Sequence, residues 1–172
     1  MSGRASQRYT PTSRPDQRFA VVASRFNEAI SKRLVDGALH AFTTAGVSAE
    51  RVDVHWVPGS FELPQAALHL AMAGRHAAIV CVGVVIRGQT PHFEHVAREA
   101  ASGIREVALR TGVPTAFGVV TALTEEQAWQ RAGGEVGNRG EEAATAALEM
   151  AEFVRTVQSG RGAARRASRR RS

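Results

Sequence analysis

The sequence predicts an α/β domain in which one parallel sheet of four strands lies between two layers of helices. Three observations lead to this expectation: four short apolar runs recur between residues 18 and 158, a segment with helical spacing follows each run, and the connections are short. Right-handed crossovers between such units bring the strands side by side and place helices on both faces of the sheet. The length of 172 residues suits one domain of this kind.

Four runs of β-prone apolar residues are the predicted strands. The third run, residues 77–86, is apolar almost throughout, as is expected of a parallel strand that is buried on both faces. It contains the only cysteine, Cys81, which we therefore expect to be a small buried core residue and not a nucleophile. The predicted strands are residues 19–23, 52–57, 77–86 and 115–121.

Helical spacing of apolar residues and capping signals predict five helices. Ile30, Leu34 and Ala38 repeat at four-residue intervals in the first of them. Thr124 is a suitable N-cap for the short fourth helix, and the fifth is rich in alanine. The predicted helices are residues 27–45, 61–73, 91–111, 124–131 and 141–157.

The formal net charge of +6 is a property of the C-terminal end. Residues 159–172 contain six arginines and no acidic residue, whereas the rest of the chain has 16 basic and 16 acidic residues. This segment and the polar residues 1–17 are expected to be a disordered tail and a disordered leader around a domain of residues 18–158. Nucleic acid is therefore expected to bind only non-specifically, through the tail.

Composition also excludes several classes of protein. No apolar run approaches the length that spans a bilayer, and residues 1–18 lack the apolar stretch of a signal peptide, so we expect a cytoplasmic protein without membrane association. A single cysteine excludes disulfides and cysteine-based metal sites. Lys32, the only lysine, lies early in a predicted helix, which disfavours a Schiff-base mechanism.

Ligands of parallel sheets bind at the carboxyl ends of the strands, so the loops that follow the strands are the candidate site. Residues 83–90 fit the spacing of a phosphate-binding P-loop, but Gln89 replaces its lysine and Val84 to Ile86 belong to a strand. What remains is a helix that Thr90 can cap and that begins at Pro91, with exposed amides near Arg87 that suit an anion. A well-capped helix without a ligand explains this segment equally well.

Three other segments have both a functional and a structural interpretation. His92 lies in the first turn of the third helix, where the helix dipole favours a neutral imidazole that can exchange protons; a solvated histidine is the alternative. Residues 58–64 suit the edge of a planar heterocycle, or form an ordinary capped turn. Arg131 and the glycine-rich residues after it suit a phosphate or polyol contact before a helix, although the segment alone is a weak signal.

Taken together, these segments resemble the lumazine synthase family over residues 18–157. The matching motifs are Arg-Phe-Asn at 25–27, Val-Pro-Gly-Ser-Phe-Glu-Leu-Pro at 57–64, Gly-Val-Val-Ile-Arg-Gly at 83–88 followed by Thr-Pro-His-Phe at 90–93, Phe-Gly-Val-Val-Thr at 117–121, and Arg-Ala-Gly at 131–133 followed by Gly-Asn-Arg-Gly-Glu-Glu-Ala at 137–143. Their order and spacing make the resemblance highly specific.

The resemblance implies a flavodoxin-like three-layer α/β/α domain and a transferase of riboflavin biosynthesis. The implied reaction condenses 5-amino-6-(D-ribitylamino)uracil with 3,4-dihydroxy-2-butanone 4-phosphate to 6,7-dimethyl-8-ribityllumazine, phosphate and water. It needs no metal, cofactor or enzyme lysine. The resemblance further implies pentamers with active sites between neighbouring subunits. The short connection at residues 131–140 is typical of members whose pentamers form an icosahedral shell, and riboflavin synthase is an expected partner.

The resemblance also implies a role for each site residue. Phe26 stacks on the pyrimidine, residues Ser60, Phe61 and Glu62 bind the pyrimidine and its ribityl chain, and Val84, Val85 and Ile86 line the same pocket. Gln89 and Thr90 hold the keto-phosphate, together with Arg131 of the adjacent subunit, which also contributes Phe117. His92 transfers protons, and Arg139 completes the substrate-binding set.

Two positions depart from the family pattern, and other functions stay open. Gln89 replaces a small residue, which changes the space around the phosphate, and Arg139 replaces a lysine, which keeps the charge and changes its geometry. The alternative function is a non-catalytic flavodoxin-like module that binds a flavin. A phosphorylated receiver domain is disfavoured, because Ser24 and Arg25 stand where it needs carboxylates.

Overall fold

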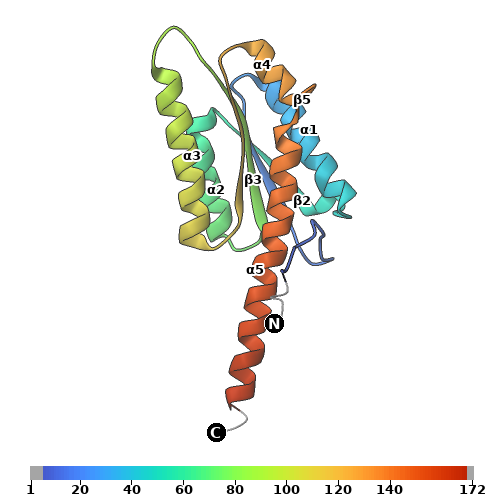
Figure 1. Ribbon diagram of the computed structural model, residues 1–172. Coiled ribbons are helices and arrows are strands. Elements are labelled where there is room, and N and C mark those ends of the chain that lie inside the picture. The colour runs from blue at the N-terminus through green and yellow to red at the C-terminus, as the bar shows by residue number, and fades with distance from the viewer. Residues whose placement is uncertain (1–5, 170–172) are drawn as a thin grey trace.

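A four-stranded parallel sheet between two layers of helices forms the body of the protein, as predicted (Figure 1). The computed structural model describes residues 6–169, with side chains up to residue 160. The strands are β1 (Phe19–Ser24), β2 (Val52–Val57), β3 (Ala78–Ile86) and β4 (Thr115–Ala122), in the spatial order β2-β1-β3-β4. β1 and β3 are therefore central, while β2 and β4 are the edges.

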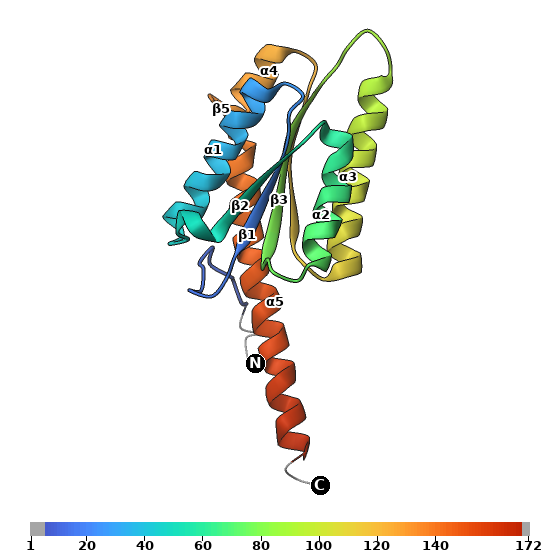
Figure 2. The same cartoon turned by 180° about the vertical axis from the view of Figure 1, so that it is seen from behind.

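Each face of the sheet is covered by its own helices, as Figures 1 and 2 show. The helices α1 (Glu28–Thr44) and α5 (Arg139–Arg169) pack on one face, and α2 (Leu63–Met72) and α3 (His92–Thr111) on the other. α4 (Glu125–Gln130) follows β4, and two short 3-10 turns, η1 (Ala49–Arg51) and η2 (Ser60–Glu62), flank β2. Thr124 caps α4 as predicted, with its side chain accepting a hydrogen bond from Gln127 N.

Two hydrophobic cores lie on the two faces of the central strands. Side chains of a strand alternate between the faces, so Phe19, Val21 and Ala23 of β1 pack with α1 and α5, while Ala20 and Val22 pack with α2 and α3. All six residues of β1 are fully buried. This is the burial on both faces that the continuous apolar runs of a parallel sheet predict.

A short antiparallel hairpin, which the sequence analysis treats as a loop, lies between α4 and α5. Its strands are β5 (Ala132–Gly134) and β6 (Gly137–Asn138). Gly133 and Gly137 have positive φ angles of 102°, a conformation in which side chains with a Cβ are strained. These glycines therefore shape a tight hairpin.

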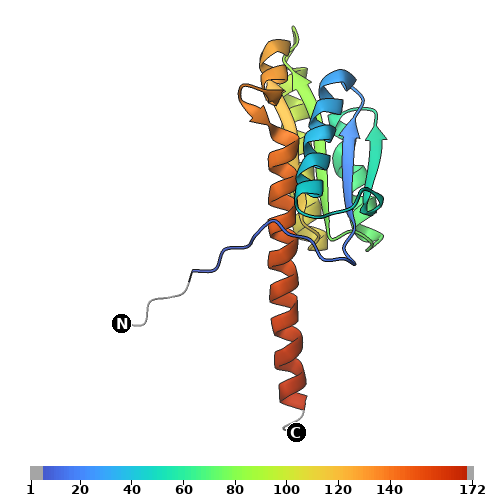
Figure 3. The same ribbon diagram turned by 90° about the vertical axis from the view of Figure 1, so that its right-hand side faces the viewer.

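The last helix reaches into the arginine-rich C-terminal segment. α5 continues without a break from Arg139 to Arg169 and extends beyond the sheet (Figures 1 and 3). Alanine and arginine are among the strongest helix formers, and a helix that has already formed grows by one hydrogen bond per residue without a new nucleation cost. The extension leaves the body at the amino ends of the strands.

The described part of the N-terminal segment is irregular and contacts the body of the domain. Residues 6–18 contain no helix or strand. Tyr9 packs edge-on against Phe153 of α5, with ring centroids 5.3 Å apart. Arg51 donates hydrogen bonds to the carbonyl oxygens of Arg14 (2.6 Å) and Gln17 (3.3 Å). Within residues 6–169, no helix is long and apolar enough to cross a membrane.

Candidate active site

A cavity of ≈ 700 Å³ opens at the carboxyl ends of β1, β2 and β3, against the start of α3. Nine of the residues that the sequence analysis assigns to the site line this one cavity: Phe26, Ser60, Phe61, Glu62, Val84, Val85, Ile86, Thr90 and His92. The others that line it are Pro58, Gly59, Gly88, Phe93, His95 and Val96. Phe93 and Val96 are not predicted, although Val96 follows His92 by four residues and so lies on the same face of α3.

The loop after β1 places Phe26 at the mouth of the cavity. The amides of Arg25 and Phe26 donate to the carbonyl oxygens of Val57 (2.8 Å) and Pro58 (3.2 Å), which joins this loop to the one after β2. Asn27 has a left-handed backbone with φ 56°, and this turns the chain into α1. The ring of Phe26 is 70% exposed, so it offers a free face for stacking.

The loop after β2 supplies the polar residues of the cavity. Gly59 has an extended backbone, and its carbonyl accepts a hydrogen bond from the amide of Glu62 (3.3 Å), which closes η2. Ser60 is buried, whereas Phe61 is 59% exposed and Glu62 is half-buried. A hydroxyl, a carboxyl and an aromatic ring therefore converge on one side of the cavity.

The end of β3 forms the apolar wall. Val84 and Val85 are buried, and Ile86 is half-buried. The ladder with β4 continues through Ile86, and the amide of Arg87 then donates to the carbonyl of Ala122 (2.9 Å). Because Val84 to Ile86 are held in the sheet, they cannot wrap around a phosphate, which agrees with the rejection of a P-loop.

α3 begins at His92 without the predicted threonine cap. Pro91, and not Thr90, is the N-cap residue, and no side chain caps the helix. The prediction was wrong because the helix begins one residue later than expected: Pro91, with φ −64°, is itself the cap residue, and Thr90 lies one position before it. The first amides of α3 are thus left without a side-chain acceptor, next to the exposed ring of His92.

Gln89 lies beside the main cavity. It lines a pocket of ≈ 160 Å³ that shares Gly88, Thr90 and Phe93 with the larger cavity. Arg87, Gln89 and Thr90 are all exposed in this loop. The loop therefore presents a guanidinium, an amide and a hydroxyl near the start of α3.

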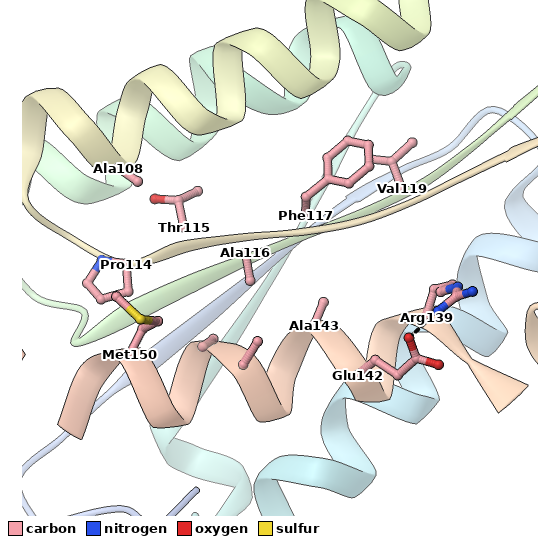
Figure 4. A pocket seen from close by; sticks show the side chains of 12 residues that line it. Ala108, Pro114, Thr115, Ala116, Phe117, Val119, Arg139, Glu142, Ala143 and Met150 are labelled. Carbon is pink, nitrogen blue, oxygen red and sulfur yellow. Dashed lines mark hydrogen bonds and ion pairs between the residues drawn. The ribbon is translucent and has the colours of Figure 1, made fainter. Parts of the chain in front are cut away.

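The remaining three predicted residues lie elsewhere on the chain. Phe117 and Arg139 line a second cleft of ≈ 530 Å³ between α3, the edge strand β4 and α5 (Figure 4). In Figure 4 the guanidinium of Arg139 points toward the carboxylate of Glu142, with which it forms an ion pair. Arg131 lines neither cavity, and its Nη1 donates to the carbonyl of Gln127 at 2.9 Å. A single chain does not bring these three residues to His92.

The Gly-Asn-Arg-Gly motif at 137–140 joins helices instead of exposing backbone to a ligand. The side chain of Asn138 donates to the carbonyl of Arg33 (2.8 Å) and accepts from the amides of Gly140 (2.9 Å) and Glu141 (3.2 Å), so it caps α5 and ties it to α1. A Cβ on Gly140 would lie 1.9 Å from the carbonyl oxygen of Leu34. The motif is therefore explained by close helix packing.

The only cysteine of the chain lies in the core and not in this cavity. Cys81 is fully buried, and desolvation raises the pKa of its thiol to about 12, so it is the predicted core residue. Among the residues that the structure describes, no three histidine, cysteine, aspartate or glutamate side chains gather as metal ligands.

Comparison with known proteins agrees with the motifs that line the cavity. The model of the 6,7-dimethyl-8-ribityllumazine synthase family matches residues 16–155. A protein of Syntrophus aciditrophicus (strain SB) with the name 6,7-dimethyl-8-ribityllumazine synthase is 49% identical over 140 residues, which are 81% of this chain and 91% of that protein. The chain belongs to the 6,7-dimethyl-8-ribityllumazine synthase family.

Proposed function

We propose that the cavity that contains His92 is where this transferase of riboflavin biosynthesis joins its two substrates. The substrates are 5-amino-6-(D-ribitylamino)uracil and 3,4-dihydroxy-2-butanone 4-phosphate, and the product is 6,7-dimethyl-8-ribityllumazine. The observation that carries this proposal is the convergence of nine predicted residues on one cavity of ≈ 700 Å³, from the loops after β1 and β2, the end of β3 and the start of α3. Its volume lies in the range of small-molecule sites. The flavin-binding alternative is not favoured, because the family is that of the synthase.

The pyrimidine is proposed to lie between Phe26 and the end of β3. The exposed ring of Phe26 offers a stacking face, while Val85 presents an apolar side chain on the face of the sheet that α2 and α3 cover, and η2 supplies polar groups. Ser60 and Glu62 then meet the polar edge and the ribityl chain of the substrate. Such an arrangement of few polar groups on apolar walls orients a planar ligand.

The keto-phosphate is proposed to bind at the start of α3. The uncapped amides there carry the positive end of the helix dipole, which favours an anion, and Thr90 and Gln89 add side-chain donors. This position brings the ketone of the bound phosphate ester toward the pyrimidine side of the cavity.

His92 is proposed to transfer protons between the two bound substrates. The primary amine of the pyrimidine attacks the ketone, and loss of water forms an imine. A proton then leaves the carbon next to the imine as phosphate is eliminated, and the resulting enol tautomerises to a ketone. The ribityl-bearing nitrogen attacks that ketone carbon and closes the ring with loss of a further water. These steps move protons to and from nitrogen, oxygen and carbon, and the exposed imidazole at the mouth of the cavity can supply and accept them.

The second cleft is proposed to complete the cavity of a neighbouring subunit. Phe117 lies on the edge strand β4 and is 45% exposed, and the cleft around it is otherwise mostly apolar. Association through this edge would let Phe117, Arg131 and Arg139 reach a neighbour's substrates. We therefore propose a homo-oligomer of pentamers, which the short connection at residues 131–140 lets close into an icosahedral shell.

Further partners are proposed from the composition and the family. We place the enzyme in the cytoplasm, with riboflavin synthase as a partner that a shell can enclose. The arginines of residues 159–172 would bind nucleic acid non-specifically, because they neutralise phosphates without contacts to the bases. The α5 extension leaves the body at the end opposite the cavity, so such binding need not obstruct the substrates (Figure 1).

Titration of the pyrimidine tests the assignment of the cavity. Phe26→Ala removes the stacking face, and we expect it to weaken pyrimidine binding by about tenfold, since a stacked ring contributes on the order of 1–3 kcal/mol. Phe153→Ala is the matched control, because this ring is also partly exposed but packs on Tyr9, far along α5. Equal affinities for wild type and Phe26→Ala would contradict the assignment.

A further inference from the structure

Two buried serine hydroxyls meet across Gly83 beneath the candidate active site. Ser24 is fully buried and Ser60 is 4% exposed, and neither Oγ has a hydrogen-bond partner among the residues that the structure describes. A Cβ built on Gly83 would lie 2.6 Å from Ser24 Oγ and 2.7 Å from Ser60 Oγ, too close for any side chain. Both hydroxyls therefore pack closely against the backbone of Gly83, from β1 and from η2.

The register of the sheet explains why these groups meet. Ala23 of β1 pairs with Val82 of β3, so Ser24 and Gly83 follow as the next neighbours. Both point to the face of the sheet that α2 and α3 cover, because they continue the alternation of Val22 and Cys81. Ser60, the first residue of η2, approaches Gly83 from the same side as Ser24 and also lines the cavity.

Buried hydroxyls without partners are costly, and here one molecule can satisfy both. An unpaired buried polar group costs on the order of 1–3 kcal/mol. A serine hydroxyl donates one hydrogen bond and accepts others, so a single water can bridge the pair. Glycine at position 83 lets both hydroxyls approach the strand backbone, because a Cβ there would collide with them.

We propose that Ser24 and Ser60 bind one buried water over Gly83, and that Ser24 is a positioning residue for the pyrimidine site. Ser24 does not line the cavity, so it acts through the water on Ser60, which fixes the start of η2 and its contacts with the ligand. This inference rests on the proposed function in one respect, the assignment of the cavity to the pyrimidine.

Steady-state kinetics of alanine variants test the positioning role. Ser24→Ala is expected to raise the KM for the pyrimidine about three- to tenfold, the effect of one lost hydrogen bond, and to change kcat by less than about twofold. The KM for the keto-phosphate should stay unchanged. Ser31→Ala is the matched control, because Ser31 on α1 is also buried with an unpartnered Oγ but does not line the cavity.

The double variant tests whether the two hydroxyls act through one shared water. If either substitution releases the water, Ser24→Ala in a Ser60→Ala background should add nothing to the effect of Ser60→Ala alone. Independent, multiplicative effects on KM would overturn the shared water. An effect of Ser24→Ala no larger than that of Ser31→Ala would overturn the positioning role.

A crystal structure of the wild-type protein tests the water directly, and it does not depend on activity. We expect one ordered water within hydrogen-bond distance of both Oγ atoms, and its loss in Ser24→Ala.

Phe26→Ala separates the assignment of the cavity to the pyrimidine from the water site. If Phe26→Ala leaves pyrimidine binding unchanged, the assignment of the cavity fails while the water site stands. If Phe26→Ala weakens binding and Ser24→Ala does not, the positioning inference fails alone. A crystal structure without a water at this position would overturn the water site.

Discussion

Nε2 of His76 lies 2.7 Å from Oδ2 of Asp53, at the amino ends of β3 and β2, away from the candidate active site. Arg18 donates to the other oxygen of the same carboxylate at 2.8 Å. The hydrogen bond from His76 is the main cause that holds the pKa of Asp53 below its ordinary value of 3.8, against an opposing effect of desolvation and with help from Arg18. This cluster ties together the starts of three neighbouring strands.

Asp53→Asn is expected to make stability less dependent on pH in acid. A carboxyl group whose pKa is lower in the folded state stabilises the fold above its unfolded pKa, and this contribution disappears as pH falls through the folded pKa. Wild type should therefore be more stable than Asp53→Asn near neutrality, and the difference should shrink as the pH falls below 3.8. Urea unfolding of both proteins at several pH values measures this difference in stability. Asp36→Asn, at an exposed position of α1, is the control, and a difference that stays constant with pH would contradict the role of the carboxylate.

Arg131→Ala is expected chiefly to weaken binding of the keto-phosphate, because a guanidinium contacts two phosphate oxygens at once. The affinity for the pyrimidine should hardly change, and Arg131→Lys should be intermediate. Titration of each substrate separately decides this. Because Nη1 of Arg131 also bonds the carbonyl of Gln127, thermal unfolding must accompany the titrations; equal losses for both substrates would indicate a folding or assembly defect instead.

Mixing two defective variants tests whether the second cleft serves a neighbouring subunit. His92→Ala removes the proton-transfer group from the cavity of its own chain. Arg131→Ala removes the guanidinium that the chain is proposed to contribute to its neighbour's cavity. After co-assembly in equal amounts, about a quarter of the sites should combine two intact parts, by random placement around a ring. Activity above that of either variant alone is expected. A mixture whose activity is only the mean of the two would contradict shared sites.

Deletion of residues 159–172 is expected to abolish binding of polyanions at low salt and to leave activity and assembly unchanged. Six arginines repeated around an oligomer make a dense positive layer, and the affinity of this layer for phosphates falls as the salt concentration rises. A salt series of DNA binding, with sedimentation of both proteins, measures this. A full-length variant with these arginines replaced by glutamine is the control for helix length. If the truncated chain sediments as pentamers while the full chain forms shells, the tail helps to build the shell.

Patterns within short segments are enough to predict most of the fold, because strands and helices arise from local periodicity. Residues 52–57 form β2 as predicted, and Thr124 caps α4. Tertiary contacts lie beyond such local patterns: Asn138 bonds to Arg33, which is 105 positions away, and no motif around Asn138 predicts this contact. The meeting of Ser24 with Gly83 likewise depends on strand register, which no local pattern reveals.

Proton transfer by His92 can be tested through the single-turnover rate of lumazine formation, followed by product absorbance. A positioned acid or base contributes about 10² or more, so His92→Ala should slow the condensation by roughly ten- to a few hundred-fold. The variant should keep its fold and its affinity for the pyrimidine, and His69→Ala, at an exposed position of α2 outside the cavity, should match wild type. An unchanged rate for His92→Ala would contradict the account.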